Sequence, residues 1–221
     1  RNMGIGGLRI GHDGLDWSEI AQRLVTRPRR AEARRDTRET RIRVRVDLDA
    51  PADDIKRGTI STGIGFFDHM LEQVAAHAGF RLDLECEGDL EVDEHHTVED
   101  CALALGDALD RALGDRRGIG RYGFVLPMDE SRAEVAVDLS GRPALVFKAD
   151  FPRDQVGGLS TEMVRHFFAS LAQSLRAAVH LEVRGENTHH MVEALFKGLG
   201  RALRPALARQ GGDVPSTKGT L

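Results

Sequence analysis

The sequence predicts an α+β fold in which two copies of one strand–helix–strand–helix unit pack their helices over mostly antiparallel sheets. Three observations support this prediction. Segments that alternate apolar and charged residues, as half-buried strands do, take turns with segments whose apolar residues recur at helical spacing. The same order of segments appears twice along the chain, and the spacing of histidines and glycines is the same in both parts.

Composition limits the class of protein. The chain has 221 residues, of which 41% are hydrophobic and 30% charged, as expected for a globular protein with a substantial core. A formal net charge of -4 argues against a dedicated nucleic-acid binder. Cys86 and Cys101 have no metal-ligand spacing and are expected to be small apolar side chains in a reducing compartment. With no apolar run of about 18 residues and no signal-peptide pattern, we expect a cytoplasmic protein without a membrane partner.

The chain divides into a linker and a main domain. "RPRRAEARRDTR" is a basic run containing proline, a composition typical of a solvated linker. The regular pattern begins at "ETRIRVRVDLD", where Ile42, Val44 and Val46 alternate with charged residues and predict a strand. We therefore expect a linker over residues 1–35 and a main domain over 36–221, with repeat halves at about 36–126 and 127–210 and a tail over 211–221.

The remaining elements of the first half follow in order. "GFFDHMLEQVAAHAGF" places Phe67, Leu71 and Val74 at helical spacing, and Gly79 is a typical helix stop. "RLDLEC" alternates and predicts a strand. The pattern from His95 to Leu113 predicts a second helix, which ends at the following glycine.

The second half repeats this order. "AEVAVDLS" and "GRPALVFKAD" predict strands, and "STEMVRHFFASLAQSLRAAV" predicts a helix with Ser160 or Thr161 as its N-cap. "HLEVRG" predicts another strand. The last helix is expected from His189 to about Ala208, bent or ended near Pro205.

The repeat also holds residue by residue. From a helix histidine to a strand-end glycine is 19 residues in both halves, and from a histidine pair to a helix glycine is 11 residues in both. The residues concerned are His69, Gly88, His95 and Gly106 in the first half and His166, Gly185, His189 and Gly200 in the second. This agreement predicts a duplicated unit.

Histidines are the candidate functional residues. Six of the nine fall at equivalent places in the halves, namely His69, His95, His96, His166, His189 and His190. A single histidine is more often a core residue than a metal ligand. Six that repeat in register, with a glutamate after each pair, indicate sites for first-row divalent metals.

Helix geometry limits how these ligands are shared. Adjacent helical residues point about 100° apart, so His95 and His96 do not easily bind one ion. His95 and Glu99 lie at i and i+4 and can chelate one ion together, although angle alone leaves the i, i+3 pair of His96 and Glu99 open.

The second half offers the same arrangement. His189 and Glu193 form its i, i+4 pair, so His96 and His190 are free to reach an ion held mainly by the opposite half. His69 and His166 remain, one for each ion. Two ions with three histidines and one glutamate each are therefore expected.

The chain resembles the imidazoleglycerol-phosphate dehydratase family over about residues 36–221. The resemblance rests, in order, on "FFDHMLEQVAAH", "DEHHTVED", "RYGFVLPMDE", "DLSGRP", "RHFF", "HHMVEALFK" and "STKG". It implies a pair of split βαβ halves of the ribosomal-protein-domain-like kind. It also implies a homo-oligomeric 24-subunit particle whose active sites, between subunits, each hold two Mn²⁺ ions, with other divalent metals possible.

The resemblance implies a hydro-lyase of histidine biosynthesis that converts imidazole glycerol phosphate to imidazole acetol phosphate and water. It assigns His69, His96, His189 and Glu193 to one ion and His95, Glu99, His166 and His190 to the other. This matches the partition from helix geometry and decides the places of His69 and His166.

Substrate contacts are also implied by the resemblance. Glu39 matches a substrate-contacting glutamate and is the first choice as general base, with Glu193 and His77 as further catalytic candidates. Phosphate-binding positions match Gln73, Arg121, Arg142, Ser216 and Lys218. Lys197, one helical turn after Glu193, matches a further substrate contact.

The first 30 residues resemble a different protein. "RNMGIGGLRI" and "LDWSEIAQRL" are similar to the tail of the histidinol-phosphate phosphatase domain that precedes the dehydratase in bifunctional enzymes. The aspartate pair of phosphatase chemistry is absent, so we expect no phosphatase activity from this chain.

Two other functional classes are compatible with paired metal sites. A dinuclear metallohydrolase commonly uses bridging aspartates, and the carboxylate count per metal is low here. A non-catalytic metal-binding cage protein would not need the matched arginines and the lysine of the tail.

Overall fold

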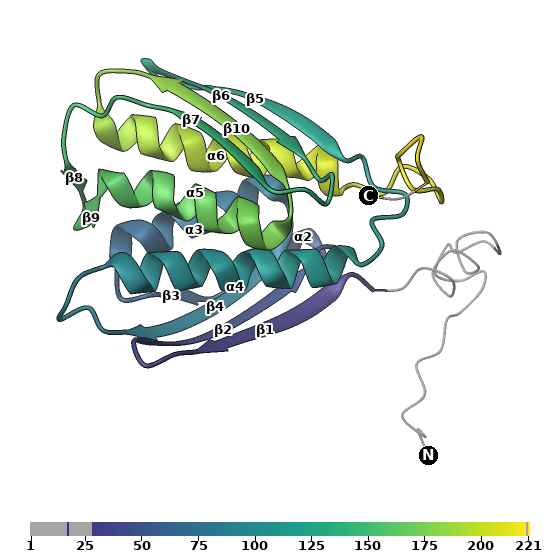
Figure 1. Cartoon of the computed structure of the whole chain (residues 1–221), viewed down its shortest axis with the longest axis horizontal. Helices are drawn as coiled ribbons and strands as arrows, with labels where there is room; N and C mark the ends of the chain where they lie inside the picture. Colours follow the sequence, from purple (N-terminus) through teal and green to yellow (C-terminus); the bar gives the residue numbers. More distant parts are fainter. Residues whose placement is uncertain (1–16, 18–27, 220) are drawn as a thin grey trace.

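The computed structural model describes residues 17, 28–219 and 221, apart from the side chains of residues 125 and 126. In this part of the chain, two four-stranded sheets enclose a layer of helices (Figure 1). The elements are β1 (Arg30–Asp36), β2 (Thr40–Asp47), α2 (Ala52–Ile55), β3 (Ile60–Ser61), α3 (Gly65–Ala78), β4 (Arg81–Gly88), α4 (His95–Leu113), β5 (Tyr122–Met128), β6 (Ser131–Asp138), β7 (Ala144–Lys148), β8 (Gln155–Val156), β9 (Leu159–Ser160), α5 (Thr161–Leu175), β10 (Ala178–Arg184) and α6 (Thr188–Leu207). The predicted α+β class is confirmed.

Both sheets have the same topology. Their strand orders are β1-β2-β4-β3 and β5-β6-β10-β7. In each sheet the first three strands pair antiparallel, and the last pairs parallel with its neighbour. Helices α3 and α4 of the first half correspond in chain order to α5 and α6 of the second. This equivalence confirms the duplication and the mostly antiparallel sheets that the sequence predicts.

Strand β1 was not expected from the sequence. Residues 30–35, predicted as part of a linker, pair with β2 from Arg30 opposite Asp47 to Asp36 opposite Arg41. The inward positions of β1 are held by small residues such as Ala33, which is buried, while arginines dominate the rest. The strand therefore lacks the Val/Ile alternation by which β2 is recognised. The expected similarity of residues 1–30 to a phosphatase tail falls almost entirely outside the described residues.

Strand β5, which pairs with β6, starts at Tyr122, a few residues before the boundary expected at about residue 126. Gly123 and Pro127 hide this strand in the sequence, since both residues are poor in strand interiors. The register with β6 shifts between Val125 and Pro127, as a proline near a bulge allows.

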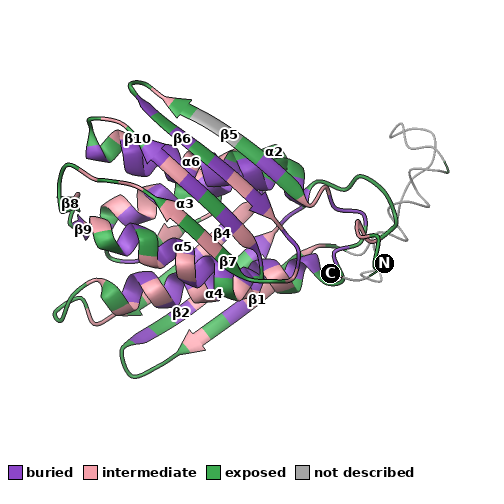
Figure 2. Ribbon diagram, turned by 45° about the horizontal axis from the view of Figure 1, so that its top comes forward, coloured by how far each residue is buried: buried purple, intermediate pink, exposed green. Residues whose placement is uncertain are grey.

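Two close helix pairs form the middle layer. A Cβ atom on Gly106 of α4 would stand 2.8 Å from the backbone nitrogen of Leu175 in α5, and one on Gly200 of α6 would stand 2.8 Å from the carbonyl oxygen of Val74 in α3. The glycines that repeat in the sequence therefore allow α4 to approach α5 and α6 to approach α3. Buried residues line the faces of helices and strands that meet in this layer (Figure 2).

The aromatic core joins the two helix pairs. Phe167 of α5 contacts Phe67 of α3 and Phe196 of α6, with ring centroids 5.6 and 4.9 Å apart. All three side chains are fully buried. Helix α6 continues through Pro205 to Leu207 instead of ending at the proline. Among the described residues, no helix is long and apolar enough to cross a membrane.

Candidate active site

The six repeated histidines lie at one end of the helical layer. Each is within the first two turns of its helix, in α3, α4, α5 or α6. The helices of each pair also begin together. The Ser160 backbone N–H before α5 donates to Glu94 before α4 over 2.8 Å, and Phe66 of α3 contacts His189 of α6 with ring centroids 5.2 Å apart. The fold thus gathers the histidines at the N-terminal ends of the helices.

The first cluster joins α4 and α5. The Oε2 atom of Glu99 lies 3.3 Å from Nε2 of His95, one turn earlier on α4, and 2.9 Å from Nε2 of His166 on α5. His166 Nε2 is buried, and it makes no hydrogen bond of acceptable geometry despite that short distance. A buried imidazole nitrogen facing a carboxylate without a hydrogen bond is suited to share a cation with it. These three residues can hold a metal ion.

The second cluster joins α3 and α6. Glu193 lies 3.6 Å from Nε2 of His69 through Oε1 and 3.5 Å from Nε2 of His189 through Oε2. Lys197, one turn further along α6, donates to Glu193 over 2.9 Å. Burial opposes ionisation of Glu193, but the hydrogen bond and charge of Lys197 and the two histidines outweigh it, so the pKa of Glu193 is lowered. Glu193 therefore stays ionised between the two histidines, with Lys197 as its counter-ion.

His96 and His190 point away from their neighbours in the sequence. Nδ1 of His96 lies 3.0 Å from Asp89, and Nδ1 of His190 lies 2.8 Å from Glu130. These hydrogen bonds raise the pKa of each histidine, and that from His190 is the largest cause that lowers the pKa of Glu130 to about 2. A carboxylate on Nδ1 fixes the ring and leaves Nε2 available, which is how metal-binding histidines are usually oriented.

The two clusters contain three members each of the two predicted ligand sets. Within the described residues, His96 does not contact His69, His189 or Glu193. His190 likewise does not contact the cluster on α4 and α5. One chain therefore brings together three residues of each predicted ligand set and directs the fourth elsewhere. The His96–Glu99 pairing that helix geometry left open does not form, since Glu99 faces His95.

Several predicted substrate contacts lie along α3 and α6 next to the second cluster. The Gln73 amide lies 3.4 Å from Nδ1 of His69. His77 lies further along α3, close to α6. A Cβ atom added to Gly200 would stand 2.8 Å from the Cβ atom of His77. Burial, and then the charges of Lys197 and Arg201, lower the pKa of His77, which favours a neutral ring at neutral pH.

Glu39 lies on the exposed turn between β1 and β2. Its carbonyl oxygen accepts from the backbone N–H of Asp89 over 3.0 Å, and its charge contributes to the raised pKa of His96. Glu39 is thus near the end of α4 that carries His96. Thr37, Glu39, Thr40 and Asp89 help to line a hollow of about 380 Å³ there.

The predicted phosphate-binding residues form a second region. Arg121, Arg142, Ser216 and Lys218 line one hollow of about 540 Å³ between the start of β5 and the C-terminal tail. Arg121 is bound by Asp138 over 2.6 Å and donates to the Pro215 carbonyl over 2.8 Å. Cationic side chains and a tail that packs on one of them form a suitable anion site. Gln73 is absent from this lining, since it lies beside His69.

The repeated histidines and the hollow at Arg121 lie at opposite ends of the helical layer (Figure 1). The Arg121 backbone N–H donates to the Ala206 carbonyl, near the end of α6, whereas His190 is in the first turn of the same helix. The 16 residues from His190 to Ala206 correspond to about 24 Å along a helix. Within one chain this hollow and the histidines cannot contact the same small substrate.

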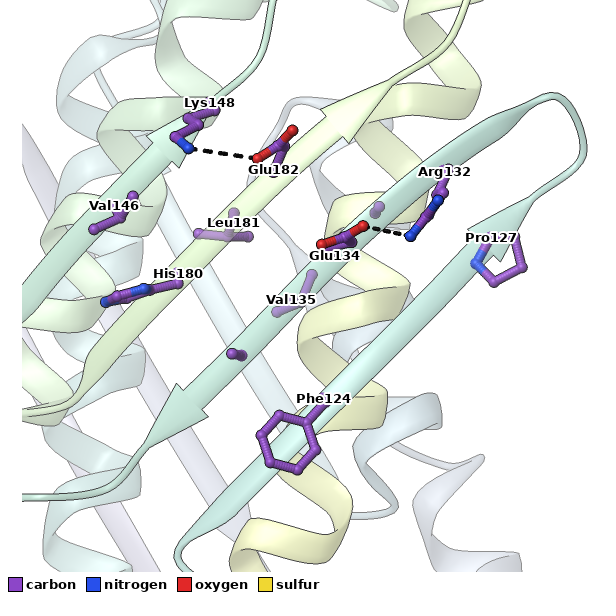
Figure 3. Close-up of a pocket in the computed structure, with 12 residues that line it drawn as sticks. Phe124, Pro127, Arg132, Glu134, Val135, Val146, Lys148, His180, Leu181 and Glu182 are labelled. Carbon is purple, nitrogen blue, oxygen red and sulfur yellow. Dashed lines mark hydrogen bonds and ion pairs between the residues drawn. The ribbon is translucent and has the colours of Figure 1, made fainter.

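Another hollow, of about 660 Å³, lies on the outer face of the sheet formed by β5, β6, β10 and β7 (Figure 3). Phe124 and Val146 are exposed there, and the charged pairs Arg132–Glu134 and Lys148–Glu182 flank them. The sheet separates this face from the helical layer and its histidines, so the hollow is not part of the candidate site.

Sequence reasoning missed the two carboxylates that orient His96 and His190. Asp89 follows β4, and Glu130 lies in the turn between β5 and β6. The available signals were a carboxylate directly after the repeated glycine for Asp89 and the "MDES" turn for Glu130. Neither signal identifies its histidine partner, because the contacts join residues 7 and 60 positions apart.

Comparisons with known proteins point to one family. Residues 62–203 match the family model of imidazoleglycerol-phosphate dehydratase. A curated relative, the histidine biosynthesis bifunctional protein HisB of Stenotrophomonas maltophilia, is 60% identical over 206 residues, which are 93% of this chain and 57% of the relative. The chain therefore spans a little over half the length of that protein.

Solved structures give the same result. The crystal structure of imidazoleglycerol-phosphate dehydratase from Staphylococcus aureus is 35% identical with a TM-score of 0.72, covering 82% of this chain and 99% of that one. The enzyme from Pyrococcus furiosus, solved as a complex, is 37% identical with a TM-score of 0.73, covering 85% and 99%. The chain belongs to the imidazoleglycerol-phosphate dehydratase family, the hydro-lyases of histidine biosynthesis.

Proposed function

We propose that this chain dehydrates imidazole glycerol phosphate to imidazole acetol phosphate at a site with two divalent metal ions, Mn²⁺ being the expected metal. One observation carries the proposal. Each chain has two three-ligand clusters, and it has two further histidines that are oriented by carboxylates but turned away from those clusters. Such a chain completes its ligand sets only with another copy.

We infer that the start of α4 in one copy faces the start of α6 in another. The first end, formed by α4 and α5, carries His95, Glu99, His166 and the projecting His96. The second end, formed by α6 and α3, carries His69, His189, Glu193 and the projecting His190. If the projecting histidines cross over, both ions gain a fourth protein ligand and keep positions open for substrate. A closed homo-oligomer such as the 24-subunit particle would repeat this contact at every site.

The phosphate of the substrate would bind to the hollow lined by Arg121, Arg142, Ser216 and Lys218. Because this hollow lies at the far end of the same chain, a neighbouring copy would supply it to the site. The C-terminal tail is held to Arg121 through Pro215. It would then act in a site whose metal ligands come from other copies of the chain.

The reaction removes a hydroxyl from the carbon attached to the imidazole ring and a proton from the next carbon. The resulting enol becomes the ketone. Bound metal ions would supply Lewis-acid stabilisation of negative charge on the ring. Glu39 would take the proton, since its carboxylate is exposed, contributes to the raised pKa of His96 and is not a predicted metal ligand. Lys197 and the neutral His77 would orient the substrate along α6.

Metal removal tests this function directly. Metal-stripped protein should regain turnover of imidazole glycerol phosphate when Mn²⁺ is added, and the His96→Ala variant should not. His180→Ala is the matched control, because His180 is an exposed histidine on the outer face of the second sheet. Absence of turnover with every divalent metal by a folded protein would contradict the proposal. Hydrolysis of peptides or phosphate esters instead would favour a metallohydrolase.

A further inference from the structure

Asp100 is a buried carboxylate that none of the roles above uses. It follows Glu99 on α4 and is 6% exposed. One of its oxygens accepts from Nε of Arg35 over 2.6 Å, and the other accepts from Oγ1 of Thr40 over 2.6 Å. Both donors belong to the β1–β2 hairpin, so Asp100 ties this hairpin to the helix that carries the first cluster.

The hairpin turn is organised around the same contact. Oγ1 of Thr37 lies 3.1 Å from Oγ1 of Thr40 and accepts the backbone N–H groups of Glu39 and Thr40 over 3.2 and 2.9 Å. Glu39 stands between these two threonines, and its carbonyl oxygen accepts from the backbone N–H of Asp89. The contact of Asp100 with Thr40 therefore holds the turn that carries Glu39.

The duplicated half has no equivalent of this anchor. Its residue at the place of Asp100, directly after the cluster glutamate, is the buried Ala194. Its hairpin carboxylate at the place of Glu39, directly before the second hairpin strand, is Glu130, which binds His190 over 2.8 Å. In that half, the histidine holds the hairpin carboxylate itself.

The first half divides these tasks between two carboxylates. Asp89 orients His96, and within the described residues the Glu39 carboxylate has no hydrogen bond or ion pair. The free carboxylate of Glu39 is available to a substrate. Unlike Glu130, however, it is not held in position by a histidine. The buried contact of Asp100 from behind the hairpin replaces that restraint.

We propose that Asp100 is a positioning residue, which holds the β1–β2 hairpin against α4 so that the Glu39 carboxylate faces the substrate beside the metal ligands. This inference rests on the function proposed above, in which Glu39 contacts the substrate. A general base must come within about 2.6–3.2 Å of the proton it removes. A displacement of about 1 Å can cost on the order of 100-fold in rate.

Two substitutions weaken the anchor without removing its volume. Asp100→Asn replaces one acceptor oxygen by an NH₂ donor, so the side chain can no longer accept from both Arg35 and Thr40. Thr40→Val removes only the hydroxyl and remains informative if Asp100→Asn fails to fold. Ser174→Ala is the control, because it also removes a hydrogen bond to α4, from Oγ of Ser174 to the Leu103 carbonyl, on the side away from the hairpin.

The experiment measures kcat, KM and bound Mn²⁺ for these variants in the full chain, alone and combined with Glu39→Gln. Asp100→Asn and Thr40→Val should lower kcat by about 10- to 100-fold while Mn²⁺ content stays complete and KM changes little. In the Glu39→Gln background they should cause no further loss, because they act through Glu39. Ser174→Ala should leave kcat unchanged in both backgrounds.

Two results overturn the inference, and they differ. If Glu39→Gln lowers kcat but the losses from Asp100→Asn or Thr40→Val multiply with it, Asp100 acts elsewhere and only this inference is wrong. If Glu39→Gln alone leaves turnover intact, the role of Glu39 in the proposed function is wrong and the positioning role is overturned with it.

Discussion

At the scale of single residues, the two histidines of each adjacent pair point in different directions and contact different carboxylates. His95 shares Glu99 with His166 inside the chain, whereas His96 turns to Asp89. The second half repeats this division with His189 on Glu193 and His190 on Glu130. Carboxylates therefore orient His96 and His190, although neither histidine belongs to a cluster of its own chain.

Glu130 should matter for metal binding although it is not a ligand. Glu130→Gln removes the negative charge that orients His190 and strengthens it as a ligand, so Mn²⁺ affinity should fall by about 10- to 100-fold. A competition titration against a metal chelator measures this change. Glu134→Gln on the adjoining strand β6, where Glu134 pairs with Arg132 on the outer face, should leave the affinity unchanged. Equal affinities in the two variants would show that Glu130 does not orient a ligand.

Sequence reasoning at this scale succeeded where the contacts are local. The i, i+4 spacing predicts that Glu99 faces His95 and that Glu193 faces His189, because helix geometry alone decides it. Asp89, Asp100 and Glu130 were not predicted. Their contacts join turns to helices or helices to a hairpin, and only the folded chain brings these segments together.

At the scale of elements, the histidine clusters depend on how closely the two helices of each pair approach one another. Gly106 and Gly200 stand 11 residues after the histidine pairs and allow the close approach of α4 to α5 and of α6 to α3. Each cluster takes ligands from both helices of its pair. The spacing between the helices therefore also sets the distances between ligands.

Gly106→Ala should separate α4 from α5. The new Cβ atom would lie 2.7 Å from Cβ of Ser174 and 2.8 Å from the Leu175 nitrogen, so the helices must shift. We expect the free energy of unfolding to fall by about 1–3 kcal/mol, measured by urea denaturation. Gly65→Ala, at the start of α3 with no atom near the added Cβ, is the control and should not destabilise the protein. If Gly106→Ala is as stable as the control, the helix pair does not need its glycine.

The outer face of the first sheet predicts a pH dependence of stability. Hydrogen bonds from Arg45, Arg34 and Arg43 lower the pKa of Glu32 from 4.5 to about 2. A lowered folded-state pKa stabilises the protein above pH 4.5, and this contribution disappears as the pH falls towards 2. Glu32→Gln should therefore lower the urea midpoint near neutral pH at low salt, and the difference from the unmutated protein should shrink by about pH 3.

The comparison for Glu32 is Glu87→Gln on the same sheet. Glu87 has one exposed partner, Arg41 at 3.0 Å, and its loss should change the midpoint less at neutral pH. A difference between Glu32→Gln and the unmutated protein that does not vary with pH would contradict the predicted role of the arginines.

The predicted elements follow the strength of their patterns. Helix α4 was predicted with its observed ends, and β2, β4, β6 and β10 were predicted from alternation. Strands β1 and β5 were not, because arginine and small residues mask the pattern in one and Gly123 and Pro127 break it in the other. Both are edge strands of their sheets, where such residues are tolerated.

At the scale of the whole molecule, the chain separates the parts of the proposed active site. The histidine clusters lie at the start of the helices, and the hollow lined by Arg121, Arg142, Ser216 and Lys218 lies at the opposite end, about 24 Å away along α6. His96 and His190 are turned from the clusters that they should complete. The central claim is therefore that no single chain contains a working site.

Subunit complementation tests this claim most directly. His95→Ala disables the α4 end and His189→Ala disables the α6 end, so each variant alone should be inactive. The two variants are then co-expressed in equal amounts and assemble at random. Each end of a site is intact in one half of cases, so about a quarter of the sites have two intact ends, and about a quarter of full turnover should return. If the mixed oligomer stays as inactive as each variant alone, the site lies within one chain and the account is contradicted.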